Sequence, residues 1–142
     1  MTHPRKTIRD AIQTALTGLT TTGSNVFQNR VFPFESGDFP GLLIYNGDEE
    51  SEPGGNDAGV QTFDRQYNCM VEGYVKAASA SIDDTLDSIA EEIETAIAAD
   101  RTLSGACGYC FTSATEFEFN ADQNKRTGIV RLTLTVLYRS TI

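Results

Sequence analysis

The pattern of hydrophobic and polar residues predicts two amphipathic helices. In each, apolar residues recur at spacings of three and four, which places them along one stripe of an α-helix. The first stripe is Ile8, Ala11, Ile12, Ala15, Leu16 and Leu19, and the second is Leu86, Ile89, Ala90, Ile93, Ala96 and Ile97. Pro4 suits the first turn of the first helix, where its missing N–H costs nothing. Ser81 suits the N-cap of the second.

Shorter apolar segments predict four or five strands between and after these helices. The segments are residues 26–34, 41–45, 61–76, 109–120 and 128–140. Within 61–76, alternation places Tyr67, Cys69, Val71 and Val75 on one face. The order α-β-β-β-α-β-β predicts a single α+β domain over residues 1–142. We expect two layers, with both helices packed on one face of a mostly antiparallel or mixed sheet.

Residues 46–59 contain no bulky apolar side chain, and this composition predicts a mobile loop over 46–60 at the tip of a hairpin. Long loops often carry function. The loop's acidic residues are therefore candidates for docking a partner: Asp48, Glu49, Glu50, Glu52 and Asp57. Calcium binding is an alternative, but the spacing does not match an EF-hand. We expect deletion of residues 49–58 to leave the domain folded.

The charge balance makes some partners poor candidates. Eleven Lys and Arg residues against twenty Asp and Glu residues give a net charge of -9. Such a chain is poorly suited to gripping nucleic acid or an anionic membrane, because both need cations. It could line a passage through which DNA slides, or the charge could serve solubility alone. No apolar run approaches the roughly 20 residues that a membrane span needs. No signal-peptide pattern is present either, so we expect action in the cytoplasm of the producing cell.

Charge is also distributed unevenly between the two helices. The second carries Asp83, Asp84, Asp87, Glu91, Glu92 and Glu94, and no Lys or Arg lies between residues 76 and 101. The first carries Arg5, Lys6 and Arg9. A polarised subunit of this kind could pair head to tail with a copy of itself, although ordinary scattered surface charge is the alternative.

The residues that could perform chemistry form no recognisable site. Cys107 and Cys110 form a C-x-x-C, but the motif follows a helix and opens a strand, the reverse of a redox site. A zinc site needs four ligands, and only Cys69 and His3 remain. His3 is the only histidine and precedes the first helix. We therefore predict no catalytic residue, no metal and no cofactor.

Several segments, taken in order, resemble the tail terminator (minor tail protein U-like) family of long-tailed bacteriophages of the lambda type. These are Phe39-Pro40-Gly41-Leu42-Leu43-Ile44-Tyr45, an acidic segment with Glu49, Glu50 and Glu52, Val71-Glu72-Gly73-Tyr74-Val75, and Asp84-Thr85-Leu86-Asp87-Ser88-Ile89-Ala90-Glu91-Glu92-Ile93. The opening helix at 9–12 and the segment 32–35 also fit. The likeness covers nearly the whole chain in element order.

The resemblance implies a virion protein assembled in the host bacterial cytoplasm. Such subunits form a six-membered ring on the growing tail tube, end its polymerisation and present a surface to the head–tail connector protein. The expected partners are copies of itself, the tail tube protein and the connector, while DNA passes without specific binding. The acidic face made by Asp83, Asp87, Glu91 and Glu94 would line the lumen or face outer solvent. The family is helix-flanked, mixed-sheet and non-catalytic.

Other functions remain open on the sequence alone. The chain could be a different virion structural protein, such as a head–tail connector, a neck protein or a tail tube subunit. An enzyme or small-ligand module would instead require a deep pocket with converging polar groups. A DNA-contacting protein is a further alternative, against which the net charge argues.

Overall fold

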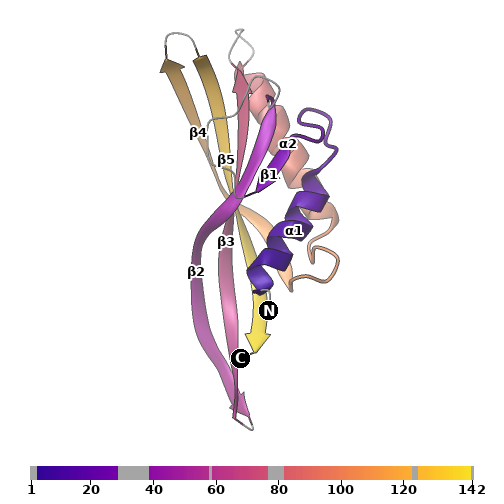
Figure 1. The fold of residues 1–142 in the computed structure, drawn as a ribbon, viewed down its shortest axis with the longest axis vertical. Helices are drawn as coiled ribbons and strands as arrows, with labels where there is room; N and C mark the ends of the chain where they lie inside the picture. The colour runs from indigo at the N-terminus through magenta and orange to yellow at the C-terminus, as the bar shows by residue number, and fades with distance from the viewer. Residues whose placement is uncertain (1–2, 29–38, 58, 77–81, 123–124, 142) are drawn as a thin grey trace.

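The protein is described from a computed structural model covering residues 3–28, 39–57, 59–76, 82–122 and 125–141. The side chains of residues 56, 57, 60 and 120–126 lie outside this description. Its elements are α1 (Pro4–Leu16), β1 (Val26–Gln28), β2 (Gly41–Asp57), β3 (Val60–Lys76), α2 (Ile82–Ala99), β4 (Tyr109–Asp122) and β5 (Lys125–Thr141) (Figure 1). The predicted order α-β-β-β-α-β-β is confirmed.

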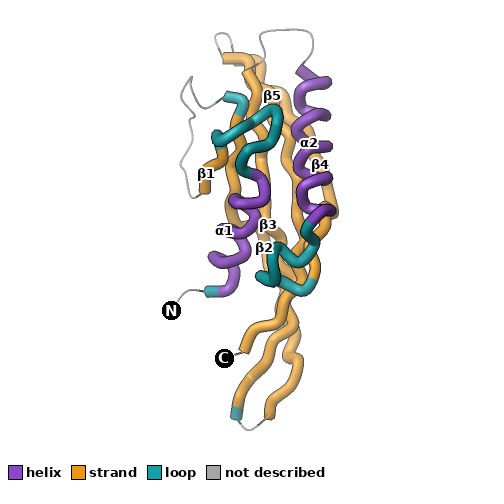
Figure 2. Tube along the Cα trace, turned by 90° about the vertical axis from the view of Figure 1, so that its right-hand side faces the viewer, coloured by secondary structure: helices purple, strands orange, loops and turns teal. Residues whose placement is uncertain are grey.

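The strands form one mixed sheet in the order β1-β2-β3-β5-β4. β1 pairs parallel with β2, and the other neighbours are antiparallel. Both helices lie on the same face of this sheet (Figure 2). α1 packs on β1 and β2, whereas α2 packs on β3, β4 and β5. The predicted two-layer α+β architecture with the helices on one face is therefore confirmed.

The hydrophobic core lies between the helices and this face of the sheet. The helical stripes contribute Ile8, Ile12, Leu16, Leu86, Ile89, Ala90, Ile93 and Ile97, all buried. The sheet contributes the predicted face of β3 and the face of β5 that carries Val130, Leu132, Leu134, Val136 and Tyr138. At Gly73 the helix approaches closely, because a Cβ there would lie 2.8 Å from Cγ2 of Ile89. A glycine at this position therefore allows α2 to pack closely against the sheet.

The prediction of a loop over 46–60 is wrong for the residues that the structure describes. β2 continues through Asp57, and its partners on β3 run to Val60. The pairing is interrupted only by register shifts between Asn46 and Glu49 and between Pro53 and Gly55. Because helices cover neither face of the hairpin beyond Glu49, the side chains there need no apolar alternation to form a strand. Backbone hydrogen bonds to β3 hold it instead.

The paired segments 50–57 and 60–66, here called the arm, extend beyond the helices at one end of the molecule (Figure 1). A strand of 17 residues spans about 55 Å, whereas an 18-residue helix spans about 27 Å. The sheet therefore outreaches its helical layer. The β4–β5 hairpin projects at the opposite end from the arm (Figure 1).

Other boundaries differ from the prediction in detail. The predicted strand at 26–34 is described only as far as Gln28. The rest of that segment and the predicted N-cap Ser81 lie outside the described residues. The last two strands are longer than the predicted segments 109–120 and 128–140, because β4 continues to Asp122 and β5 begins at Lys125.

Candidate functional site

The five acidic residues predicted to dock a partner are not gathered on one surface. Alternation along β2 separates Glu49 from Glu50 and Glu52, because Glu49 pairs with Tyr67 on the helix-covered face. Asp48, Glu50 and Glu52 are exposed. Asp57 pairs with Val60 near the end of the hairpin, and its side chain lies outside the described residues.

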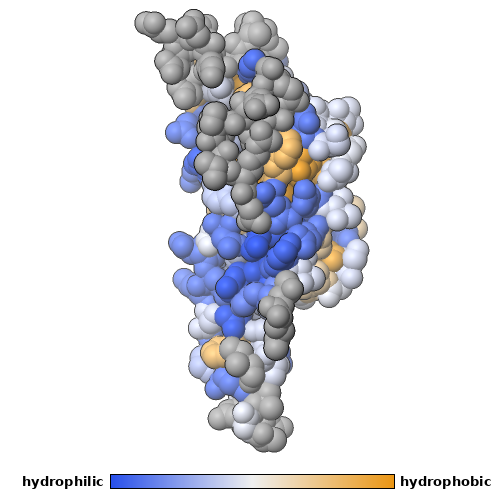
Figure 3. Space-filling model, viewed as in Figure 1, coloured by the Kyte–Doolittle hydropathy of each residue, from blue (hydrophilic) through white to orange (hydrophobic). Residues whose placement is uncertain are grey.

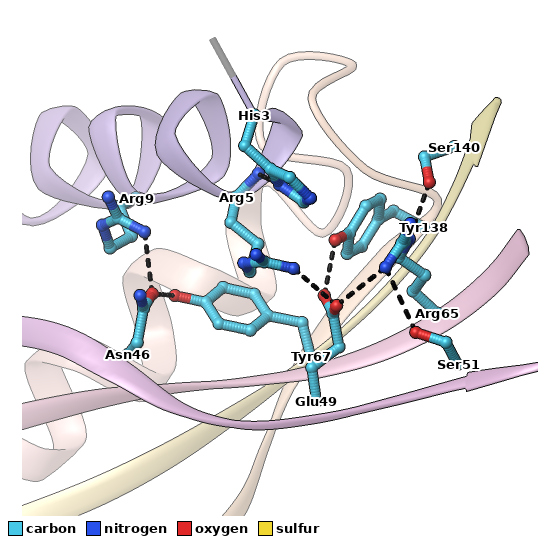
Figure 4. Close-up of polar contacts among 10 residues, drawn as sticks. All are labelled: His3, Arg5, Arg9, Asn46, Glu49, Ser51, Arg65, Tyr67, Tyr138 and Ser140. Atoms are coloured by element: carbon cyan, nitrogen blue, oxygen red, sulfur yellow. Dashed lines mark hydrogen bonds and ion pairs between the residues drawn. The ribbon is translucent and has the colours of Figure 1, made fainter. Parts of the chain in front are cut away.

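Glu49 is instead bound within the chain, at the base of the arm (Figure 4). Its carboxylate accepts hydrogen bonds from Nη1 of Arg5 at 2.6 Å and from Nη1 of Arg65 at 3.1 Å. The hydroxyl of Tyr138 donates to its other oxygen. The side chain is only 12% exposed. Burial and the Glu49 charge raise the pKa of Tyr138 to about 12.

Arg65 extends this network across the strands. Its Nε donates to the hydroxyl oxygen of Ser140 at 2.6 Å, and its Nη1 donates to that of Ser51 at 3.2 Å. Together with Glu49, these contacts join α1, β2, β3 and β5. Figure 3 shows hydrophilic surface over the middle of the molecule, where the start of α1 meets β2. The network fixes the base of the arm to the body of the domain.

A second polar cluster ties the first turns of α1 to the sheet. Asn46 Oδ1 accepts from Nη1 of Arg9 at 2.7 Å and from the hydroxyl of Tyr67 (Figure 4). His3 caps the helix, because its Nδ1 accepts from the backbone N–H of Arg5 at 3.1 Å. Partial burial, together with the Arg5 charge, lowers the pKa of His3. The histidine therefore has a structural role that the sequence did not reveal.

The four acidic residues predicted to form one face of the second helix lie on α2. Asp83, Asp87, Glu91 and Glu94 are all exposed, and none forms an ion pair with a Lys or Arg among the residues described. Glu92 differs from them: it accepts from the backbone N–H of Thr21 at 2.8 Å and from its hydroxyl. This contact holds the turn after α1 against α2.

The three cysteines are free thiols. Cys69 and Cys110 are buried in the core, and burial raises the pKa of each to about 12. Cys107 is half-buried, and burial raises its pKa as well. Thiols in such surroundings are poor nucleophiles at neutral pH. Across the described part of the chain, no three His, Cys, Asp or Glu side chains are grouped as a metal site would need.

Exposed large apolar side chains gather along the edge strand β4. They are Tyr109, Phe111, Phe117 and Phe119 of β4 and Leu137 of β5, here called the β4 edge patch. A bulge between Thr112 and Ala114 divides the patch between the two faces. Before it, Tyr109 and Phe111 share the open face with Leu137; after it, Phe117 and Phe119 lie on the helix side. The sequence marked these aromatics as strand residues but gave no sign of their exposure.

Two open grooves flank these surfaces. One, of about 490 Å³, runs between the end of α2 and β4, and its lining includes Glu94, Arg101 and Tyr109. The other, of about 670 Å³, lies beside the base of the arm, with Glu50, Glu52 and Cys107 in its lining. Among the described helices, none is long and apolar enough to cross a membrane.

Comparisons with known proteins add little to this geometry. No protein-family model matches the chain, and a search of curated proteins finds no similar sequence. Among solved structures, the virion of a native gene transfer agent (GTA) particle contains a chain that matches it at 14% identity with a TM-score of 0.40. The match covers 96% of this chain and 90% of that chain. A likeness this distant supports no argument about fold or function.

Proposed function

We propose that this chain is a structural subunit of a long-tailed phage virion that assembles as a ring on the tail tube and ends tube growth. The ordered resemblance in sequence motivates the proposal. The structural observation that carries it is a sheet whose arm outreaches the helices at one end, with aromatic side chains exposed along one edge. Exposed apolar patches of this kind mark protein–protein contacts.

A terminator needs two different ends, because one must bind the tube and the other must not. The arm and the β4–β5 hairpin project at opposite ends of this domain (Figure 1). We assign tube docking to the arm, on which Glu50 and Glu52 are exposed. The opposite end would then face the head–tail connector. Ring closure requires a head-to-tail contact whose rotation returns to the first copy.

The acidic face of α2 suits a passage for DNA, because carboxylates repel phosphates and keep the duplex from sticking. Asp83, Asp87, Glu91 and Glu94 are exposed. The same carboxylates could instead lie between copies, facing cations of the neighbouring subunit. The lumen position predicts that neutralising them slows DNA passage, whereas the position between copies predicts that neutralising them weakens self-association.

We also propose that the subunit acts by binding and not by catalysis. The side chains best suited to chemistry have structural partners or lie in the core. His3 caps α1, Glu49 is bound by two guanidinium groups, and Cys69 and Cys110 are buried. Such engagement favours a structural function for each.

A second candidate is a tail tube subunit or a connector protein of the same kind of virion. The observation that favours this candidate is that the sheet has two edges. Copies joined edge to edge form a filament instead of a ring when the rotation between them does not close. Electron microscopy of concentrated protein separates the two, since a terminator gives closed rings and a tube subunit gives extending tubes.

The decisive experiment adds purified chain to tubes growing from the tube protein of the same phage. We expect tube length to fall as the chain is added, with a ring at one tube end. A variant with residues 53–63 replaced by Asn-Gly should stay folded and lose this effect, because Glu52 and Asp64 lie directly opposite and a two-residue turn joins them.

Two outcomes would overturn the proposal. One is an unchanged tube length with the wild-type chain, and the other is full capping by the shortened variant. The matched control keeps the arm but carries Glu50→Gln and Glu52→Gln. It separates the contribution of the arm backbone from that of its carboxylates.

A further inference from the structure

The edge strand β4 has one side that pairs with no strand in the described part of the sheet. Its other side pairs with β5. Its 14 residues present a row of unpaired backbone donors and acceptors about 45 Å long. Natural proteins usually shorten, cover or charge such edges, because they promote association.

The exposed apolar area on this edge accounts for part of an interface. Phe117 and Phe119 are 56% and 55% exposed, and Tyr109, Phe111 and Leu137 each nearly 40%. With about 200 Å² for each aromatic side chain, the four rings expose about 400 Å² of surface. This is about half of the roughly 800 Å² that each partner contributes to a specific interface, and the backbone edge and the neighbouring polar side chains would supply the rest.

The negative charge near β4 favours a cationic surface over a second β4 edge as its partner. Two β4 edges brought together symmetrically would place Glu116 and Glu118 of both copies close to each other. These side chains are 69% and 59% exposed, and they share the single guanidinium of Arg131. On the helix side of the sheet, the acidic residues of α2 would also approach those of the other copy. Like charges at such a contact cost several kcal/mol, so a cationic partner is favoured.

The opposite side of the same molecule offers that partner. α1 covers the β1 and β2 edge and carries Arg5, Lys6 and Arg9 against one acidic residue, Asp10. By contrast, α2 carries six acidic residues and no Lys or Arg. Lys6 is half exposed, and its ion pair with Asp10 is a surface pair that a second carboxylate can share.

The strand directions also fit. β2 is antiparallel to β3, β3 to β5 and β5 to β4, so β4 runs antiparallel to β2. β1 covers the outer side of β2 only at residues 42–44, and within the described residues no strand pairs with the rest of that side. Two copies in the same orientation can therefore bring β4 of one alongside the part of the β2 edge beyond residue 44 of the next.

We propose that the β4 edge patch of one copy docks against the α1–β2 edge of a second copy. In this contact the acidic face of α2 in the first copy lies opposite Lys6 and Arg9 of the second copy. This inference rests on the proposed self-assembly and names the surfaces that perform it. The contact is head to tail, so it repeats around a ring. The aromatic side chains supply the buried area, and the charges set the orientation.

Two charge-reversed variants test the pairing. The first carries Asp87→Lys, Glu91→Lys and Glu94→Lys on α2, and the second carries Lys6→Glu and Arg9→Glu on α1. Sedimentation velocity over a range of concentrations should show each variant alone associating at least about 10-fold more weakly than wild type. An equimolar mixture should associate nearly as well as wild type, because every contact then joins opposite charges. Circular dichroism confirms that each remains folded.

A third variant tests the apolar part of the contact. Phe117→Ser with Phe119→Ser should weaken association relative to wild type by the same factor at low and at high salt. The association of wild type should itself weaken as salt rises, because salt screens the charged part of the contact. Lys76→Glu is the matched control for the two charge-reversed variants. Lys76 lies on the central strand β3, outside the proposed contact, so this variant should associate like wild type.

The outcomes separate this inference from the proposed function. If wild type associates and the charge-reversed variants associate equally well, this interface is wrong while self-assembly stands. If only the α2 variant changes and the α1 variant behaves like wild type, α1 is not the surface that faces α2, and the proposed interface is wrong. If wild type stays monomeric at every concentration, both the interface and the ring are overturned.

Discussion

Replacement of Glu49 by alanine tests whether the base of the arm is fixed by its polar network. The carboxylate is the shared acceptor for Arg5, Arg65 and the Tyr138 hydroxyl. Its removal leaves two cations without their anion. Arg65 is only 13% exposed and cannot rehydrate fully, whereas Arg5 is 29% exposed and can turn toward water.

The expected loss of stability follows from these exposures. Removing one partner of a buried ion pair costs about 3–5 kcal/mol, and a hydrogen bond to a charged group contributes about 1.5–3 kcal/mol. Because Arg5 recovers hydration, we expect the lower part of this range, about 2–4 kcal/mol. In a domain of this size, each kcal/mol lowers the Tm by about 3–4 °C, so the Tm should fall by about 6–16 °C.

Urea and thermal unfolding of the full chain measure this effect. Glu50→Ala is the matched control, since Glu50 is the next residue on β2 and is exposed; its change should stay within about 0.5 kcal/mol. A loss below about 1 kcal/mol for Glu49→Ala would refute the reasoning. It also follows that deletion of residues 49–58 unfolds the base of the arm, contrary to the expectation from sequence.

Three further predictions concern the core and the helix cap. Gly73→Ala should destabilise the fold by about 1–3 kcal/mol in urea unfolding, because the new methyl group meets Ile89 at 2.8 Å; unchanged stability would contradict the close packing. The pKa of His3 is lowered from 6.5, so the unfolded chain binds its proton first and stability should fall as pH drops below 6.5 toward the lower folded value. His3→Asp keeps a cap and should flatten that part of the stability profile measured between pH 7 and 5.5. Cys69 and Cys110 should react with iodoacetamide only after unfolding, and rapid alkylation of native protein would contradict their burial.

The helices and the central strands were predictable because one face of each is buried. Burial imposes a period of 3.6 on α2 and a period of two on β3, and both periods are visible in the sequence. The arm has no such constraint, since its strands are held by backbone pairing and no helix covers them. A polar segment of this kind has the composition of a loop, although its backbone forms a ladder.

The surfaces were less predictable than the fold, and β4 shows why. Aromatic side chains alternate along it at Tyr109, Phe111, Phe117 and Phe119, as they would if all faced one side. The bulge beside Ser113 adds one residue and turns the second pair to the other face. No local pattern specifies that extra residue. The Glu49 network was hidden for a related reason, because its partners lie 44, 16 and 89 residues away along the chain.

A paired arm is better suited to docking than the mobile loop that its composition suggested. A loop that orders on binding loses backbone entropy, about 1–2 kcal/mol for each residue fixed. The arm is already paired between β2 and β3 and held at its base by Glu49, so most of this backbone entropy is lost during folding and not on binding. Binding energy can then appear as affinity for the partner. The same rigidity makes position matter, so the network at Glu49 should influence docking through the direction of the arm.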